Sequence, residues 1–112
     1  LWDTLVIEAT GDGIAESAVV MRYEMHVRPE ASRSVAWAEA QWKKIDRALA
    51  ALEERWLSQL SGPLDMGQVA VGAALGYLDF RHADRNWQAL HPALAAWWAG
   101  FSARPPLAST AP

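Results

Sequence analysis

The chain has 112 residues, no cysteine and a formal net charge of −3, and 52% of its residues are hydrophobic. This size and hydrophobic content suffice for one packed domain, 1–112, and the absence of cysteine excludes disulfides, thiolate metal sites and a cysteine nucleophile. The slightly acidic charge argues against a nucleic-acid-binding surface, and the uncharged, apolar stretch 66–78 is too short to span a membrane.

A first helix is predicted over 2–26, where apolar residues recur at steps of three to five residues. Gly11 and Gly13 interrupt this pattern, and each costs about 0.5–1 kcal/mol relative to alanine in a helix interior. We therefore expect a kink or a closely packed neighbour at this point. Arg28 and Pro29 are predicted to end the helix.

A second helix is predicted from Pro29, which suits a first helical position because its missing N–H would be unpaired there anyway. Charged residues fall mostly off its apolar stripe, which indicates a solvated face. Turn residues at 61–63 are predicted to close the helix. The apolar stripe consists of Ala38, Trp42, Ile45, Leu49, Leu52 and Trp56.

A third helix is predicted over 65–81. Asp65 can accept a hydrogen bond from the backbone N–H three residues on, and the Gln68 amide can reach back, which predicts a reciprocal capping box. The segment 69–80 is apolar nearly all round, so we expect this helix to be buried at the centre of the bundle.

The remaining sequence predicts one short turn over 84–90, anchored by Trp87, and a last helix that Pro92 opens. Pro105 and Pro106 are predicted to stop that helix. No strand pattern or internal repeat is found. The sequence therefore predicts an all-α bundle of about five helices.

Catalytic and metal-binding patterns are lacking. The three histidines do not have the spacing of a helical metal pair, so no metal site is predicted, and His91 is expected to contribute to a helix start. The glycines at 11 and 13 do not follow a strand, which argues against a phosphate loop. Asp79 is expected to be a structural acid with Arg81 and Arg85 nearby, and no catalytic residue is predicted.

Three segments in this order resemble the closing helices of bacterial glutathione S-transferases: 76–81 (GYLDFR), 91–97 (HPALAAW) and 101–105 (FSARP). Upstream, 12–14 (DGI), 22–24 (RYE) and 28–30 (RPE) resemble the first two helices of the same C-terminal domain. The resemblance covers essentially the whole chain. One departure is the central helix, where Asp65 and Gln68 stand in place of the family's Ser or Thr and Asp.

The resemblance implies that an N-terminal thioredoxin-like domain, absent from this sequence, binds the co-substrate glutathione and activates its thiol. The chain alone is therefore expected to be inactive. The intact enzyme would conjugate glutathione to a small hydrophobic electrophile, as in detoxification, or isomerise such a compound. The C-terminal domain would supply one wall of the electrophile pocket and part of a homodimer interface.

By the same resemblance, Asp12 falls where family members often place an acid near the glutathione amino group of the neighbouring subunit. Ala18 and Arg22 fall near positions that face the electrophile, and Tyr77 falls beside that pocket. Two other interpretations stay open. Asp12 can bond locally within a glycine-weakened helix, and Tyr77 can be an ordinary core aromatic.

A second functional hypothesis is a non-catalytic helical interaction module, because the same bundle serves as a scaffold in translation assemblies. The lack of cysteine fits a cytoplasmic location. No secretory leader is evident, and the first residue is Leu rather than Met, which suggests a fragment of a longer protein.

Overall fold

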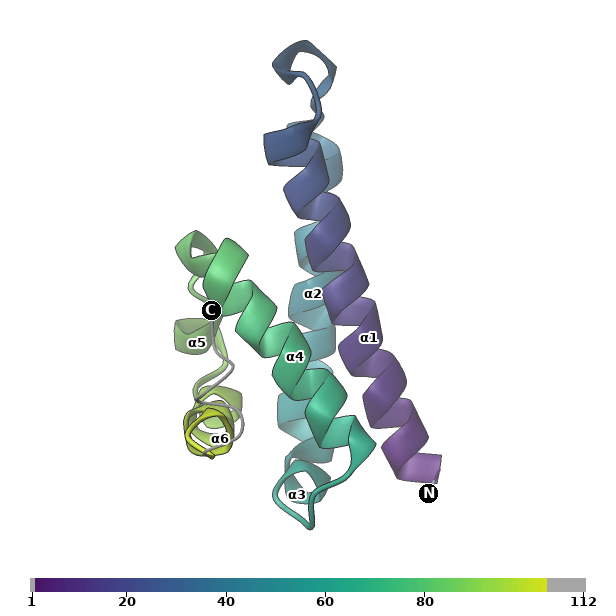
Figure 1. Ribbon diagram of the computed structural model, residues 1–112, viewed down its shortest axis with the longest axis vertical. Helices are drawn as coiled ribbons and strands as arrows, with labels where there is room; N and C mark the ends of the chain where they lie inside the picture. Colours follow the sequence, from purple (N-terminus) through teal and green to yellow (C-terminus); the bar gives the residue numbers. More distant parts are fainter. Residues whose placement is uncertain (1, 105–112) are drawn as a thin grey trace.

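The computed structural model describes residues 2–104, which form α-helices joined by turns and contain no strand (Figure 1). Helices α1 (Trp2–Arg22) and α2 (Val35–Ala51) make a long antiparallel pair, α4 (Met66–Arg81) packs along α1, and α6 (Pro92–Ser102) lies on the other side of α4. The short helices α3 (Leu57–Leu60) and α5 (Trp87–Leu90) complete the bundle. The prediction of an all-α fold is confirmed.

Helix α1 runs through both glycines and continues as a π-helical turn (Tyr23–Val27), close to the predicted range. Gly11 has the close neighbour that the sequence predicts. A Cβ atom at this position would lie 2.8 Å from the carbonyl carbon of Ala70 and from the backbone nitrogen of Val71. A Cβ atom at Gly13 would meet nothing within 4 Å, so nothing in the described chain requires a glycine there.

The predicted start of the second helix at Pro29 is wrong. Pro29 has a ψ of 137°, which is not helical, and a short 3₁₀ turn (Glu30–Ser32) follows it. Helix α2 begins at Val35 and is capped by the Ser34 hydroxyl, which accepts a hydrogen bond from the Trp37 N–H at 3.2 Å. The Ser34 N–H donates to the Glu24 carboxylate at 2.9 Å, so a side chain from the preceding helical turn fixes where α2 starts.

Helix α2 extends through a second π-helical turn (Leu52–Trp56) into α3, and the chain turns at 61–63 as predicted. Asp65 caps α4 by accepting from the Gln68 N–H at 3.0 Å. The reciprocal part of the predicted capping box is wrong, because the Gln68 amide nitrogen donates to the carbonyls of Gly62 and Pro63 instead. The buried amide thus provides a donor for the turn before α4.

Helix α4 is the central helix of the bundle, as predicted. Val71, Ala74, Leu75 and Leu78 are fully buried in the core. One side of α4 stays uncovered in the described chain. We call this side the open strip, and it consists of Met66, Val69, Ala73 and Phe80, of which Met66 and Phe80 are 58% and 51% exposed.

Three acids spaced seven residues apart along α2 and its π-helical turn hold the C-terminal segment. Seven residues are about two helical turns, so the three carboxylates share one face. The lysines 43 and 44 and Arg47 are exposed, as predicted for a solvated face. The row of acids consists of Glu39, which pairs with Arg85, Asp46, which contacts His91 Nε2 at 2.7 Å, and Glu53, which accepts from the Leu94 N–H at 2.9 Å.

The C-terminal helices begin as predicted, with Trp87 buried and Pro92 at the first position of α6. His91 precedes α6, but its side chain contacts Asp46 and does not cap the helix. The capping acceptor is Glu53, which comes from a distant part of the chain. The predicted stop at Pro105 and Pro106 lies outside the described residues.

Candidate functional site

The site residues suggested by the sequence lie on the two helices that pack most closely. Asp12, Ala18 and Arg22 belong to α1, and Tyr77 belongs to α4. Asp12 is exposed and makes no hydrogen bond or ion pair within residues 2–104. Ala18 is fully buried, whereas Arg22 and Tyr77 are partly buried. The Ala18 methyl therefore does not reach the surface of this domain.

Ala18, Arg22 and Tyr77 come together around His82, a residue that the sequence did not single out. His82 follows the last residue of α4 and is 5% exposed. Its Nε2 atom lies 2.9 Å from the Ala18 carbonyl oxygen. Since a carbonyl oxygen can only accept, Nε2 carries the hydrogen and donates it. The imidazole lies 6.0 Å from the Tyr77 ring, measured between centroids.

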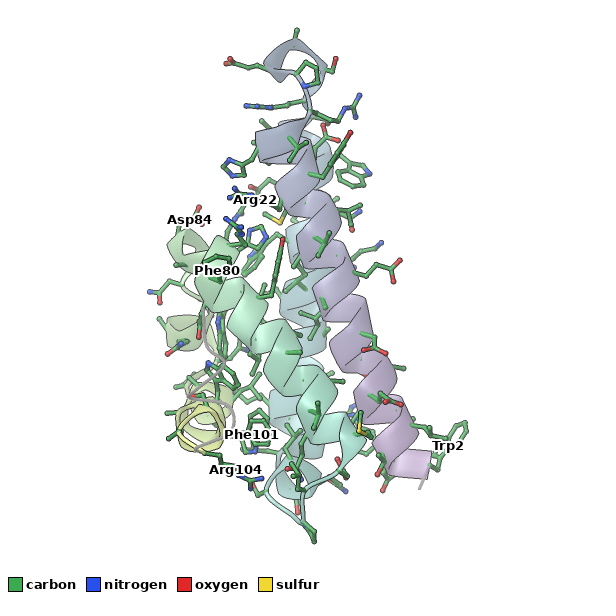
Figure 2. The ribbon with its side chains drawn as sticks, in the orientation of Figure 1. Trp2, Arg22, Phe80, Asp84, Phe101 and Arg104 are labelled. Carbon is green, nitrogen blue, oxygen red and sulfur yellow. The ribbon has the colours of Figure 1, made fainter. Side chains whose placement is uncertain are left out.

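Burial is the main influence on His82, and it lowers the pKa of the imidazole from its ordinary value. The positive charges of Arg85 and Arg22 also lower this pKa, whereas the hydrogen bond to Ala18 and the charge of Asp84 oppose the shift. The imidazole is therefore neutral near pH 7. In Figure 2, Arg22, Phe80 and Asp84 all lie near the C-terminal end of α4.

The hollows on the described surface lie elsewhere. One of about 280 Å³ is lined by Gly13, Ser17 and Lys44 among others, and one of about 390 Å³ is lined by Tyr23 and Trp37 among others. Both lie between α1 and α2. A third, of about 260 Å³, borders α6. None of the three is lined by Asp12, Ala18, Arg22 or Tyr77.

Asp79 is a structural acid, as expected, but its predicted partners are wrong. It is exposed, and its carboxylate accepts from the indole N–H groups of Trp87 at 2.9 Å and Trp98 at 2.7 Å, and from the Gln88 amide at 3.0 Å. The reason is that α5 and α6 fold back against α4 and bring these N–H groups to one carboxylate. The Asp79 carboxylate makes no hydrogen bond or ion pair with Arg22, Tyr77 or His82.

Two further observations concern membrane-spanning helices and metal-binding clusters. Within the described range, no helix is long and apolar enough to cross a membrane. No three histidine, aspartate or glutamate side chains of residues 2–104 converge in a way that could hold a metal ion.

Comparison with known proteins places these features in a family. The family described as "Glutathione S-transferase, C-terminal domain" matches residues 35–99. A GST-like protein of Escherichia coli K12, YibF, is 31% identical over 108 residues, which cover 95% of this chain and 53% of that protein.

Solved structures agree with this match. A glutathione transferase family member from Pseudomonas fluorescens, with bound S-(propanoic acid)-glutathione, has a TM-score of 0.96 and 41% identity over 99% of this chain and 57% of its own. A glutathione S-transferase from Methylobacterium radiotolerans, in complex with glutathione sulfonate, has a TM-score of 0.80 and 31% identity over 99% of this chain and 53% of its own.

The chain thus spans little more than half the length of these relatives. The family match covers more than half of the chain, and the structural agreement extends over nearly all of it. The chain belongs to the glutathione S-transferase family and corresponds to its C-terminal domain.

Proposed function

We propose that this domain forms the electrophile-binding wall and part of the dimer interface of a glutathione transferase. The intact enzyme would conjugate glutathione to a small hydrophobic electrophile. The observation that carries the proposal is the TM-score of 0.96 to a relative that holds a glutathione adduct. Members of the family carry a thioredoxin-like N-terminal half, which would bind glutathione and activate its thiol.

The proposed wall is the surface formed by Arg22 and Tyr77, with Ala18 buried beneath it. His82 fixes this surface by joining the end of α4 to the Ala18 carbonyl of α1. A wall held by two packed helices suits catalysis by positioning, because it orients an electrophile beside a thiolate prepared elsewhere. Asp12 is exposed and has no hydrogen-bond or ion-pair partner among residues 2–104, which suits contact with the glutathione amino group of a second subunit.

The N-terminal half would cover the open strip. Met66, Val69 and Phe80 are large apolar side chains exposed on one side of the most apolar helix. Apolar area of this kind is stabilising when another domain removes it from water. Docking there would place the missing half beside the seam between α1 and α4, where Arg22 and Tyr77 lie.

The dimer interface would use the groove between α1 and α2. Gly13 lies in that groove, and a Cβ atom added there would meet nothing within 4 Å, so no close packing among residues 2–104 compensates its cost in helix stability. Glu16 on α1 and Lys43 and Lys44 on α2 are exposed. A two-fold axis would place Glu16 of one copy opposite the lysines of the other.

The enzymatic proposal is tested with the full-length protein and a panel of electrophiles. We expect glutathione conjugation by the full-length protein and none by residues 1–112 alone. We also expect full-length protein, and not the fragment, to be retained on immobilised glutathione. A full-length protein without conjugating or isomerising activity would favour the non-catalytic interaction module instead.

The dimer proposal is tested by Gly13→Leu. The added side chain enters open space, so the fold should persist, but the groove is filled and we expect a monomer in sedimentation velocity. Gly100→Leu is the matched control, because a Cβ atom there also meets nothing within 4 Å and the residue lies on α6. A dimer that survives Gly13→Leu would exclude this face.

A further inference from the structure

Arg22 differs from the other partly buried arginines. The domain has four arginines of intermediate exposure, and three of them bind an acceptor. Arg22 makes no hydrogen bond, ion pair or cation–π contact within residues 2–104, although the guanidinium carries a full charge. The bound three are Arg28, which pairs with Glu24, Arg33, which donates to the Arg28 carbonyl, and Arg85, which pairs with Glu39.

No carboxylate of residues 2–104 forms an ion pair with Arg22. The His82 N–H is already used by the Ala18 carbonyl, and the imidazole is neutral. The Tyr77 hydroxyl makes no hydrogen bond to a described residue. Asp84 acts on the same imidazole, but it does not come within ion-pair distance of Arg22. Arg22 is partly buried and has no anionic partner among residues 2–104, so this surface is suited to an anionic ligand.

We propose that Arg22 binds a carboxylate on the electrophile. The planar guanidinium matches a carboxylate with two parallel hydrogen bonds, which fixes the orientation of the bound molecule. The substrate class is thus an electrophile with an apolar body and an acidic group. This inference rests on the proposed function, because it assumes that the surface faces the electrophile.

The test compares two electrophiles that differ only in charge, 4-(bromomethyl)benzoate and 4-(bromomethyl)benzamide, with the full-length protein. In both reactions the glutathione thiolate forms a C–S bond to the benzylic carbon, and bromide leaves with the electron pair of the C–Br bond. The thiol proton has already passed to solvent. We expect the wild-type protein to prefer the carboxylate in kcat/KM.

Replacing Arg22 should remove this preference. We expect Arg22→Gln to lower kcat/KM for the carboxylate roughly 10- to 100-fold, the range expected for hydrogen bonds to a charged group. The loss should lie mainly in KM for the carboxylate. The loss in kcat/KM for the amide should be smaller than the loss for the carboxylate, Arg22→Lys should restore part of the preference, and the control Arg55→Gln should keep it.

Direct binding gives a second readout. The affinity for S-(4-carboxybenzyl)glutathione, measured by titration calorimetry, should fall on Arg22→Gln, and the affinity for the matching carboxamide should not. An equal loss for both electrophiles, or a rise confined to the KM of glutathione, would overturn the inference while the proposed function stands. A wild-type protein that conjugates neutral electrophiles but not the carboxylate would also overturn it. Absence of conjugation with every electrophile would overturn the proposed function itself.

Discussion

His82 is a buried base at the junction of the two helices that form the proposed wall. Its side chain is buried, so protonation of the ring would place a charge in a largely desolvated position. Protonation of His82 is therefore less favourable in the folded state than in the unfolded chain.

This difference predicts a pH dependence of stability. Because the pKa of His82 is lowered in the folded protein, the unfolded state binds more protons below about pH 6.5, and the free energy of unfolding falls as the pH decreases. His82→Gln can keep a donor to Ala18 but cannot titrate. We expect the stability advantage of wild type over this variant, measured by urea unfolding, to shrink between about pH 7 and pH 5. A constant difference would contradict the prediction.

Gly11 illustrates a second constraint at the scale of single residues. The backbone of α4 lies so close to α1 that a methyl group cannot fit without a shift of one helix. We expect Gly11→Ala to reduce the free energy of unfolding by about 1–3 kcal/mol, as overpacking does, in spite of the better helix propensity of alanine.

The matched control is Gly100→Ala on α6, where the added methyl meets open space. At position 100 only the gain in helix propensity acts, so the free energy of unfolding should rise by about 0.5–1 kcal/mol. Chemical denaturation of both variants measures the contrast. Stabilisation by Gly11→Ala would mean that α1 and α4 do not approach as closely as described.

At the scale of elements, the row of acids on α2 determines where the C-terminal helices lie. Glu39, Asp46 and Glu53 each bind a group from the segment 85–94, across 41 to 46 residues of sequence. Asp79 adds a second attachment, because it accepts from N–H groups of both α5 and α6. Polar side chains thus position two short helices that have few buried residues of their own.

The contact between Glu53 and α6 can be tested by itself. Glu53→Ala removes the acceptor for the Leu94 N–H, and loss of such a cap costs about 0.5–2 kcal/mol. Glu54→Ala is the control, because Glu54 is exposed and next in sequence. We expect lower thermal stability and faster amide exchange at Leu94 for the first variant only. Equal behaviour of the two variants would show that the cap is energetically unimportant.

At the scale of the whole molecule, one side of the domain exposes large apolar side chains to solvent. The open strip exposes methionine, valine and phenylalanine side chains on α4, the helix whose other sides form the core. The described chain has no element that covers it, and the relatives are almost twice as long.

A double variant, Met66→Gln and Phe80→Gln, tests whether the N-terminal half covers the strip. In the full-length protein we expect the free energy of unfolding to fall by about 1–3 kcal/mol, because two apolar side chains no longer bury their area against the N-terminal half. Proteolysis between the halves should also be faster. Leu90→Gln is the control, since Leu90 is 58% exposed on α5. If the double variant and this control have the same stability and the same rate of proteolysis, the open strip is not the contact with the N-terminal half.

Sequence alone determined the features that depend on local chemistry. The all-α fold, the extents of α1 and α4, the Asp65 cap and the proline start of α6 follow from apolar periodicity and from residues within one turn of each helix end. The suggested site residues came from family resemblance, and their roles as contacts to glutathione and the electrophile stay predictions.

Tertiary structure decided which polar groups meet. The start of α2, the amide partners of Gln68 and the indole partners of Asp79 differ from the sequence-based predictions. His82 was missed because its acceptor, the Ala18 carbonyl, lies 64 residues away in sequence. A hydrogen bond forms only where packing brings donor and acceptor together, and neither spacing nor composition specifies that meeting.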